Sequence, residues 1–221
     1  MLKSQKNLQD DPHSCSDKPK RNVIVTGFGP FFGHSVNASW ESVKLLPNIF
    51  EDDSINLIVE EIPVTYCAIE ETIPKLWKEY DPIFVIHAGV SSLANNLTIE
   101  RCAKLKGYNR RDVDGQIPCG EACKFGLEEV LHSKVDVIDL CTQMNDMKSN
   151  VKTSISTDAG SYCCEYIYYT SLCHGEGRCL FVHVPQLGKP YQAEEIAQGL
   201  NNILRIVLDQ LSSNKVLENT L

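Results

Sequence analysis

The sequence predicts an α/β fold, a single three-layer α/β/α sandwich with a mostly parallel mixed sheet. Short apolar, β-branched runs alternate with stretches of helical periodicity along most of the chain, which is typical of strands covered by helices on both faces. A length of 221 residues suits one substantial domain. We therefore expect a domain over residues 22–212, between a disordered polar extension over 1–21 and a polar tail over 213–221.

Hydrophobic periodicity predicts each element in turn. Continuous apolar runs, two of them closed by a glycine, predict buried strands, and apolar residues that recur every three or four positions predict helices. Pro74 falls inside one helical pattern and predicts a bend or a break there. Residues 106–125 are rich in Gly, Arg, Asp and Cys without a period, which predicts a long loop of the kind that often carries function. The expected strands are 22–28, 55–62, 83–89, 96–104, 151–156 and 178–184, and the expected helices are 38–46, 66–80, 135–147, 159–172 and 194–211.

Composition argues against two classes of partner. The net charge is −8, and phosphate binding needs clustered positive charge, so we expect no nucleic acid. A run of about 18 apolar residues, as a membrane span requires, is missing from the sequence. Residues 1–21 also lack the apolar centre of a secretory signal. We therefore expect no membrane partner and a cytoplasmic location.

The ten cysteines predict reduced thiols, because the chain is long enough to form a core without disulfides and shows no export signal. Cys67 and Cys141 lie in apolar-periodic stretches and are interpreted as small buried hydrophobic residues. Cys119, Cys123 and His132 have the spacing of a partial zinc site, but a fourth ligand at a usual interval is missing. The sequence therefore predicts no metal site, and we expect no cofactor.

Residues near the ends of predicted strands indicate a nucleophilic site, since ligands of open α/β sheets gather at the carboxyl ends of strands. Residues 157–165 contain Cys163 and Cys164 near the start of a predicted helix, where the helix dipole favours a thiolate. His183 ends a strand, and a Cys–His pair oriented by a carboxylate such as Glu100 is a common way to activate a thiol. These residues alone leave open which cysteine faces the cleft. They also leave the alternatives that His183 is a core histidine and that Glu100 is a solvated glutamate.

Four groups of motifs occur in order along the chain. They are Thr26-Gly-Phe-Gly-Pro-Phe31 with Val36-Asn-Ala-Ser-Trp40, His87-Ala-Gly-Val-Ser91 with Leu97-Thr-Ile-Glu100, Asp158-Ala-Gly-Ser-Tyr-Cys-Cys164, and Phe181-Val-His-Val-Pro185 with Leu187-Gly-Lys-Pro190. Together they resemble the pyroglutamyl-peptidase I family of cysteine peptidases, and especially its animal members. The resemblance runs from about Asn22 to Leu211.

The resemblance implies a peptidase that removes an N-terminal pyroglutamyl residue from small peptides. It implies that Cys164 is the nucleophile, that His183 is its base and that Glu100 orients the imidazole, whereas Cys163 packs. Aromatic walls would bury the neutral lactam ring of the substrate and reject a charged amine. The resemblance places Phe28, Phe31 and Asn37 in this pocket, and we add Tyr162 and Cys163 because they directly precede the nucleophile. Core packing stays the alternative for the two phenylalanines.

The sequence departs from the family pattern in two places. Phe32 stands where the family often has glycine, which predicts a changed pocket edge. This change motivates an alternative function, a pyroglutamyl-peptide-binding or regulatory protein with impaired catalysis. The loop 106–125 differs from the arginine-bearing loop of bacterial members, so Arg110 and Arg111 stay only candidates for an oxyanion partner. A redox role for the adjacent cysteines is disfavoured by the strain of such a disulfide, and we expect a monomer or a weak homo-oligomer.

Overall fold

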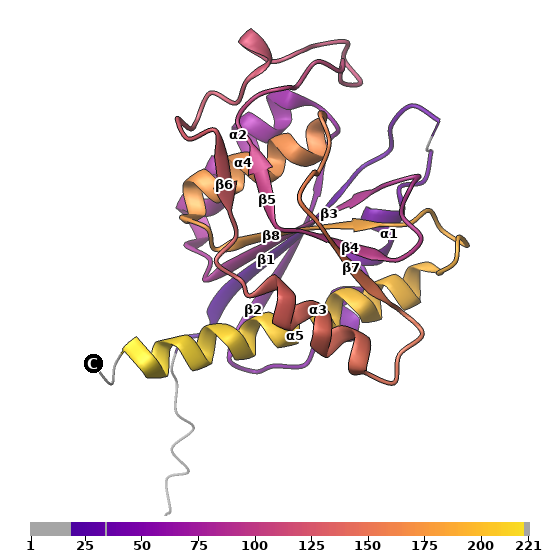
Figure 1. The fold of residues 1–221 in the computed structure, drawn as a ribbon, viewed down its shortest axis with the longest axis vertical. Coiled ribbons are helices and arrows are strands. Elements are labelled where there is room, and N and C mark those ends of the chain that lie inside the picture. Colours follow the sequence, from indigo (N-terminus) through magenta and orange to yellow (C-terminus); the bar gives the residue numbers. More distant parts are fainter. Residues whose placement is uncertain (1–18, 34, 219–221) are drawn as a thin grey trace, which may run out of the picture.

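The structure, a computed structural model, describes residues 19–33 and 35–218, with side chains in the last helix up to residue 213 (Figure 1). The strands are β1 (Arg21–Phe28), β2 (Ile55–Ile62), β3 (Phe84–Val90), β4 (Leu97–Glu100), β5 (Cys102–Lys104), β6 (Val130–His132), β7 (Thr153–Ser156) and β8 (Cys179–Val184). The helices are α1 (Ala38–Val43), α2 (Tyr66–Tyr80), α3 (Val137–Asp146), α4 (Cys163–Gly175) and α5 (Ala193–Glu218), with short 3-10 turns at Leu46–Asn48 and Cys119–Glu121.

The main sheet has six strands in the order β2-β1-β3-β8-β4-β7. Neighbouring strands run parallel except for β4 and β8, which are antiparallel. Helices α2 and α4 cover one face, and α1, α3 and α5 cover the other (Figure 1). The predicted three-layer α/β/α sandwich with a mostly parallel mixed sheet is therefore confirmed.

The alternation of side chains along each strand separates two cores and decides on which face the polar residues lie. On β8, Val182 belongs to the core under α1, α3 and α5, whereas Phe181 belongs to the core under α2 and α4. His183 has the parity of Phe181 and therefore lies on the α2–α4 face. On β4, Ile99 belongs to the first core, so Glu100 also lies on the α2–α4 face. The sheet thus presents the imidazole and the carboxylate on one side.

Two predictions around the middle of the chain are wrong. The strand expected over 96–104 is two strands in different sheets, because β4 pairs with β7 and β8 whereas β5 pairs with β6. The helix expected over 135–147 begins only at Val137, where Asp136 accepts hydrogen bonds from the backbone N–H groups of the first turn. Strand β6 had no periodic signal, since it has only three residues and pairs only with β5.

The remaining four helices also differ from the prediction, three at an end and α2 in its interior. Helix α4 begins at Cys163 and not at 159, because the Asp158 carboxylate accepts from the Gly160 N–H and Gly160 takes a φ of +96°. Helix α2 continues through Pro74, so the predicted break does not occur. Helix α1 is shorter than the expected 38–46 and is followed by the first 3-10 turn. Helix α5 continues beyond its expected end to Glu218, into the segment expected to be a polar tail.

Most of the predicted N-terminal extension lies outside the described residues, and so do residues 219–221. Cys67 is exposed and Cys141 is half-buried, so the prediction that both are buried is wrong for Cys67 and only partly met for Cys141. Within the described part of the chain, no cluster of three His, Cys, Asp or Glu side chains could hold a metal ion. None of the helices over residues 19–33 and 35–218 combines the length and the apolar character of a membrane span.

Candidate active site

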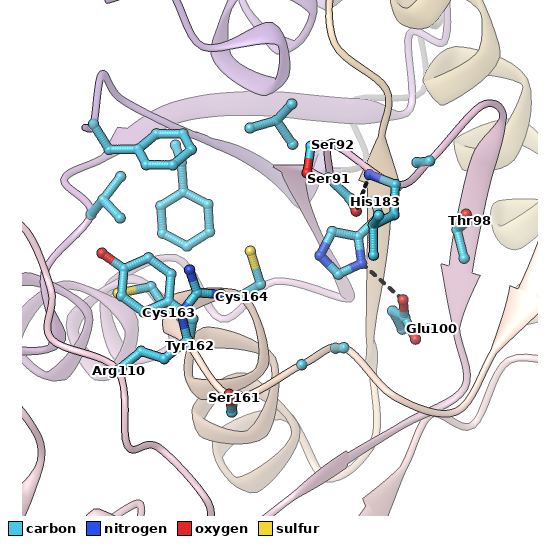
Figure 2. A pocket seen from close by; sticks show the side chains of 18 of the residues that line it. Ser91, Ser92, Thr98, Glu100, Arg110, Ser161, Tyr162, Cys163, Cys164 and His183 are labelled. Atoms are coloured by element: carbon cyan, nitrogen blue, oxygen red, sulfur yellow. Dashed lines mark hydrogen bonds and ion pairs between the residues drawn. The ribbon is translucent and has the colours of Figure 1, made fainter. Parts of the chain in front are cut away.

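The candidate site lies where the N-terminus of α4 meets the carboxyl ends of β3 and β8 (Figure 2). Since β4 runs antiparallel to β8, the loop from β3 to β4 crosses the end of β8, and the Ser91 N–H donates to the Val184 carbonyl at 2.9 Å. We expected the carboxyl end of strand 151–156 at this edge. β7 runs parallel to β4 and therefore opposite to β8, but its last residue, Ser156, lines the cavity, and so do residues 158–164 that follow it.

Cys164 lies in the first turn of α4, on the side of the helix that faces the sheet. Tyr162 is the N-cap residue, and its side chain makes no capping hydrogen bond. The first N–H groups of the helix are therefore not used by a side-chain cap. A Cβ atom at Gly89 would lie only 2.9 Å from Cys164 Sγ and 2.7 Å from Phe181 Cζ. Only glycine fits at this position of β3, and its lack of a side chain lets the sulfur lie directly against the strand.

The imidazole of His183 lies between a thiol and a carboxylate (Figure 2). Its Nδ1 donates to Glu100 Oε1 at 2.8 Å, and its other side faces the sulfur of Cys164. The Glu100 side chain is only 2% exposed, and its Oε2 has no hydrogen-bond partner among the described residues. A buried carboxylate with so few partners is stable only beside a positive charge. The geometry therefore favours a protonated imidazole next to Glu100.

The pKa of His183 results from opposing effects. Burial lowers this pKa, but the hydrogen bonds with Cys164 and Glu100, together with the negative charges of these two groups, raise it to about 10. The imidazole is consequently cationic at neutral pH. A cation beside a cysteine favours the thiolate form, and a protonated imidazole can donate its proton to a leaving group.

The two adjacent cysteines have different surroundings. Cys163 is 1% exposed and packs in the α2–α4 core, whereas Cys164 is half-buried at the cavity. Burial raises the pKa of the Cys163 thiol well above its usual range, which keeps this thiol protonated. The residues alone left open which cysteine faces the cleft. In the structure it is Cys164, whose sulfur is accessible.

A cavity of about 820 Å³ opens beside the Cys164 sulfur. Phe28 is only 3% exposed and belongs mostly to the core, as its alternative interpretation proposed. Phe31 is less buried and packs against the same core. The lining includes every residue that the sequence predicts for the site, namely Phe28, Phe31, Asn37, Glu100, Tyr162, Cys163, Cys164 and His183.

Asn37 holds the loop that carries the two phenylalanines. Its Nδ2 donates to the Gly29 carbonyl at 2.8 Å, and its Oδ1 accepts from the Ser39 N–H at 3.1 Å and from the Ser39 hydroxyl at 2.9 Å. Asn37 is also the N-cap of α1. Since its carbonyl oxygen already accepts twice, this geometry indicates that the side chain shapes the cavity wall. Direct contact of Asn37 with a substrate stays a prediction.

Two arginines, Arg110 and Arg111, line the cavity and bring positive charge to it. The Arg110 guanidinium lies 5.2 Å from the centre of the Tyr162 ring. Its backbone is held by Tyr66, whose hydroxyl donates to the Arg110 carbonyl at 2.8 Å and whose N–H donates to Asp112 at 2.9 Å. Arg111 donates to the Gly115 carbonyl within its own loop. Both stay candidates for contact with negative charge in the cavity.

Glu165 is a residue of this region that the sequence analysis missed. It follows Cys164 in the first turn of α4, is 1% exposed, and accepts a hydrogen bond from the Lys104 N–H at 3.1 Å. This bond ties the N-terminus of α4 to β5. An acidic residue in a first helical turn is a recognisable sequence signal, but its burial depends on β5, which periodicity did not identify.

We expect Glu165 to make the protein less stable as the pH rises. Burial raises the pKa of this carboxyl from 4.5 to about 7, although the Lys104 charge and N–H oppose the rise. The folded state therefore binds the proton more tightly than the unfolded state, and the free energy of unfolding decreases between about pH 5 and pH 8. Glu165→Gln keeps an acceptor for the Lys104 N–H without the ionisation. It should reduce this decrease by an amount on the order of 2 kcal/mol.

Urea unfolding at pH 5 and at pH 8 measures this effect. The matched control is Glu79→Gln, because Glu79 is an exposed glutamate of α2. An identical pH dependence in wild type and in Glu165→Gln would contradict the prediction.

Comparison with known proteins places these features in a family. A family model described as pyroglutamyl peptidase matches residues 21–208. Pyroglutamyl-peptidase 1 from Homo sapiens is 41% identical over 199 residues, which cover 90% of this chain and 95% of the human protein. Pyrrolidone-carboxylate peptidase from Thermococcus kodakarensis is 30% identical over 204 residues, which cover 86% of this chain and 97% of that protein.

A solved structure has the same fold. A mutant pyrrolidone carboxyl peptidase from the hyperthermophile Pyrococcus furiosus superimposes with a TM-score of 0.77 at 24% identity, over 86% of this chain and 99% of that one. The predicted family is confirmed, and so is the resemblance to animal members, since relatives from human, rat and mouse are 41%, 42% and 42% identical. The chain therefore belongs to the pyroglutamyl peptidase family, a family of cysteine-type hydrolases.

Proposed function

We propose that the chain hydrolyses the bond after an N-terminal pyroglutamyl residue of small peptides, with Cys164 as nucleophile, His183 as acid and base, and Glu100 as the orienting carboxylate. One observation carries the proposal. The His183 imidazole lies 2.8 Å from Glu100 and faces the Cys164 sulfur, beside a cavity with aromatic walls. A thiol, a base and a group that orients the base are the parts that covalent acyl transfer requires.

The first step forms a thioester. The Cys164 sulfur attacks the carbonyl carbon of the pyroglutamyl residue, and the carbonyl oxygen becomes negatively charged. The backbone N–H of Cys164, in the first turn of α4, is a suitable donor to this oxygen, because helix N-termini stabilise negative charge. When the carbon–nitrogen bond breaks, the protonated His183 gives its proton to the leaving amine.

The second step releases the acid. His183, now neutral, takes a proton from a water molecule, and the hydroxide attacks the thioester carbonyl. The carbon–sulfur bond breaks, the sulfur leaves as a thiolate, and pyroglutamate is released. The proton that His183 has accepted restores the starting state. Glu100 holds the ring through Nδ1 during both steps, so that the other nitrogen stays directed at the sulfur and the substrate.

The cavity accounts for selectivity toward a lactam. Phe28, Phe31 and Tyr162 offer aromatic surface to a small neutral ring. A free, charged N-terminal amine would lose its hydration against these walls without gaining a carboxylate partner from them, and this desolvation is costly. We therefore propose that prolyl and glutamyl N-termini are poor substrates.

The alternative is a protein that binds pyroglutamyl peptides without turning them over. It is favoured by Phe32, which replaces a residue that is often glycine in the family and is 82% exposed at the cavity rim. Since Phe32 lies at the edge and not between the sulfur and the imidazole, we favour the enzyme.

We expect the purified full-length chain to release a fluorophore from a pyroglutamyl amide of aminomethylcoumarin. Its kcat/KM for this compound should exceed that for the prolyl and glutamyl amides by at least about a thousandfold, because the cavity desolvates a charged amine. Equal cleavage of the prolyl amide would contradict the proposed specificity. Saturable binding of the pyroglutamyl amide without release of the fluorophore would support the binding protein instead.

A further inference from the structure

Two large apolar side chains stand exposed at the rim of the cavity. Leu93 is 93% exposed and Phe32 is 82% exposed, and both line the cavity. Single exposed apolar residues are common on protein surfaces, but their concentration at the edge of a binding cavity marks a contact surface. The lactam ring is small and fits beside Phe28 and Phe31, so the rim residues are free to contact another part of the substrate.

The loop from β3 to β4 holds Leu93 above the strand that carries His183. In the sheet β8 lies between β3 and β4, and the loop must therefore cross its carboxyl end. The Ser91 N–H donates to the Val184 carbonyl at 2.9 Å, which fixes the start of the loop. The Ser91 side chain and carbonyl accept from the N–H groups of Leu93 and Ala94, each at 3.3 Å. This turn directs the Leu93 side chain outward at the mouth.

Phe32 extends the aromatic wall to the rim. It follows Phe31, which packs against the core and lines the same cavity. The next residue, Gly33, has a φ of +78°, so the chain turns directly after Phe32. The apolar surface therefore continues from the wall for the ring to the edge of the cavity.

The proposed reaction fixes the direction in which the rest of the bound peptide extends away from the sulfur. His183 must protonate the nitrogen of the second substrate residue, so this nitrogen lies next to the imidazole. The side chain of the second residue is attached one carbon away and therefore lies near the imidazole, where the β3–β4 loop crosses the end of β8 (Figure 2). Arg110 lies beside Tyr162, and Arg111 donates to the Gly115 carbonyl within its own loop. On the His183 side the loop from β3 to β4 carries Leu93 next to Ser91 and Ser92, so this surface is uncharged and Leu93 is its large apolar group.

We propose that Leu93 and Phe32 form a second subsite, which binds an apolar side chain on the residue after pyroglutamate. This inference rests on the proposed function and specifies its substrates as pyroglutamyl peptides with a leucine-like or phenylalanine-like second residue. The subsite leaves the chemistry unchanged and adds contacts with the leaving portion of the peptide.

Three peptide amides test the proposal, namely pGlu-Phe-NH2, pGlu-Gly-NH2 and pGlu-Asp-NH2. The amide terminus removes a carboxylate that the arginines could bind. We expect wild type to have a kcat/KM about tenfold higher for the phenylalanine peptide than for the glycine peptide, as contact with one apolar side chain can provide. In the Phe32→Ala/Leu93→Ala double variant this ratio should fall close to one. Leu127→Ala is the matched control, because Leu127 is 96% exposed and does not line the cavity, and it should leave the ratio unchanged.

An unchanged ratio in the double variant would overturn the subsite. A preference for the aspartate peptide would also overturn it and would assign the second residue to the arginines. If wild type cleaves none of the three peptides and also spares the pyroglutamyl coumarin amide, the proposed function itself fails. Cleavage of all three at equal rates rejects the subsite alone.

Discussion

Replacing Cys164 by serine is expected to lower the kcat for a pyroglutamyl amide by about four orders of magnitude or more. A hydroxyl is a far weaker acid than a thiol, so the cationic His183 cannot keep its oxygen in a nucleophilic form. The effect should fall on the chemical step, and the variant should still bind the substrate. Stopped-flow and steady-state fluorescence measurements with the coumarin amide measure this loss of kcat. Undiminished turnover in this variant would reject Cys164 as nucleophile.

The neighbouring cysteine provides the matched comparison. Cys163→Ser places a hydroxyl at a position that is 1% exposed, so some loss of stability is expected, but turnover should stay within about tenfold of wild type. Brief treatment with iodoacetamide at pH 7 should modify Cys164 in preference to Cys163, because Cys163 is buried and its pKa is raised. Equal losses of activity in both serine variants would contradict the separation of the two thiols.

The Glu100→Gln variant should show the second large loss, with kcat reduced by about a hundredfold to ten thousandfold. An amide can still contact His183 Nδ1, but it removes the negative charge that orients and stabilises the imidazolium. The hydrogen bond and the charge of Glu100 are among the causes that raise the pKa of His183 to about 10. Without them this pKa falls, and the alkaline limb of the pH profile of kcat/KM should move to lower pH.

The pH profile distinguishes this orienting role from a merely structural one. A variant that is only misfolded would lose amplitude at every pH without moving the limb. Glu100→Asp keeps the charge and should retain more of the alkaline limb than Glu100→Gln. A normal limb in Glu100→Gln, together with near-normal kcat, would contradict the role of Glu100.

The pKa of His183 also determines how the free energy of unfolding changes with pH. Protonation of His183 stabilises the fold fully below about pH 6.5, and this contribution is lost as the pH rises through about 10.

The regular parts of the fold could be predicted from periodicity because their burial patterns are local. Strand β2 occupies the predicted residues 55–62, and α2 has its predicted ends at Tyr66 and Tyr80. Periodicity failed where a distant partner decides the structure. Strand β5 leaves the main sheet and pairs with β6, which lies further along the chain. The start of α4 is set locally instead, by the turn at Gly160.

The residues of the candidate site could be proposed from the sequence, but their geometry could not. Glu100, Cys164 and His183 were predicted by motif resemblance, and the structure places all three at one cavity. The reversal of β4 against β8 could not be read from the sequence, although it brings Glu100 beside His183. The burial of Glu165 was equally hidden, because it depends on contact with β5.

The place of β8 in the sheet has a consequence for how the enzyme is made. It is the last strand along the chain, yet it lies between β3 and β4, which are synthesised much earlier. During translation the Cys164 thiol on α4 therefore emerges before the His183 imidazole, so the set of proposed catalytic groups is incomplete until β8 has been made. Until β8 inserts, β3 and β4 also lack the backbone partner that lies between them. Insertion of this one strand thus completes the six-stranded sheet and brings the proposed catalytic groups together.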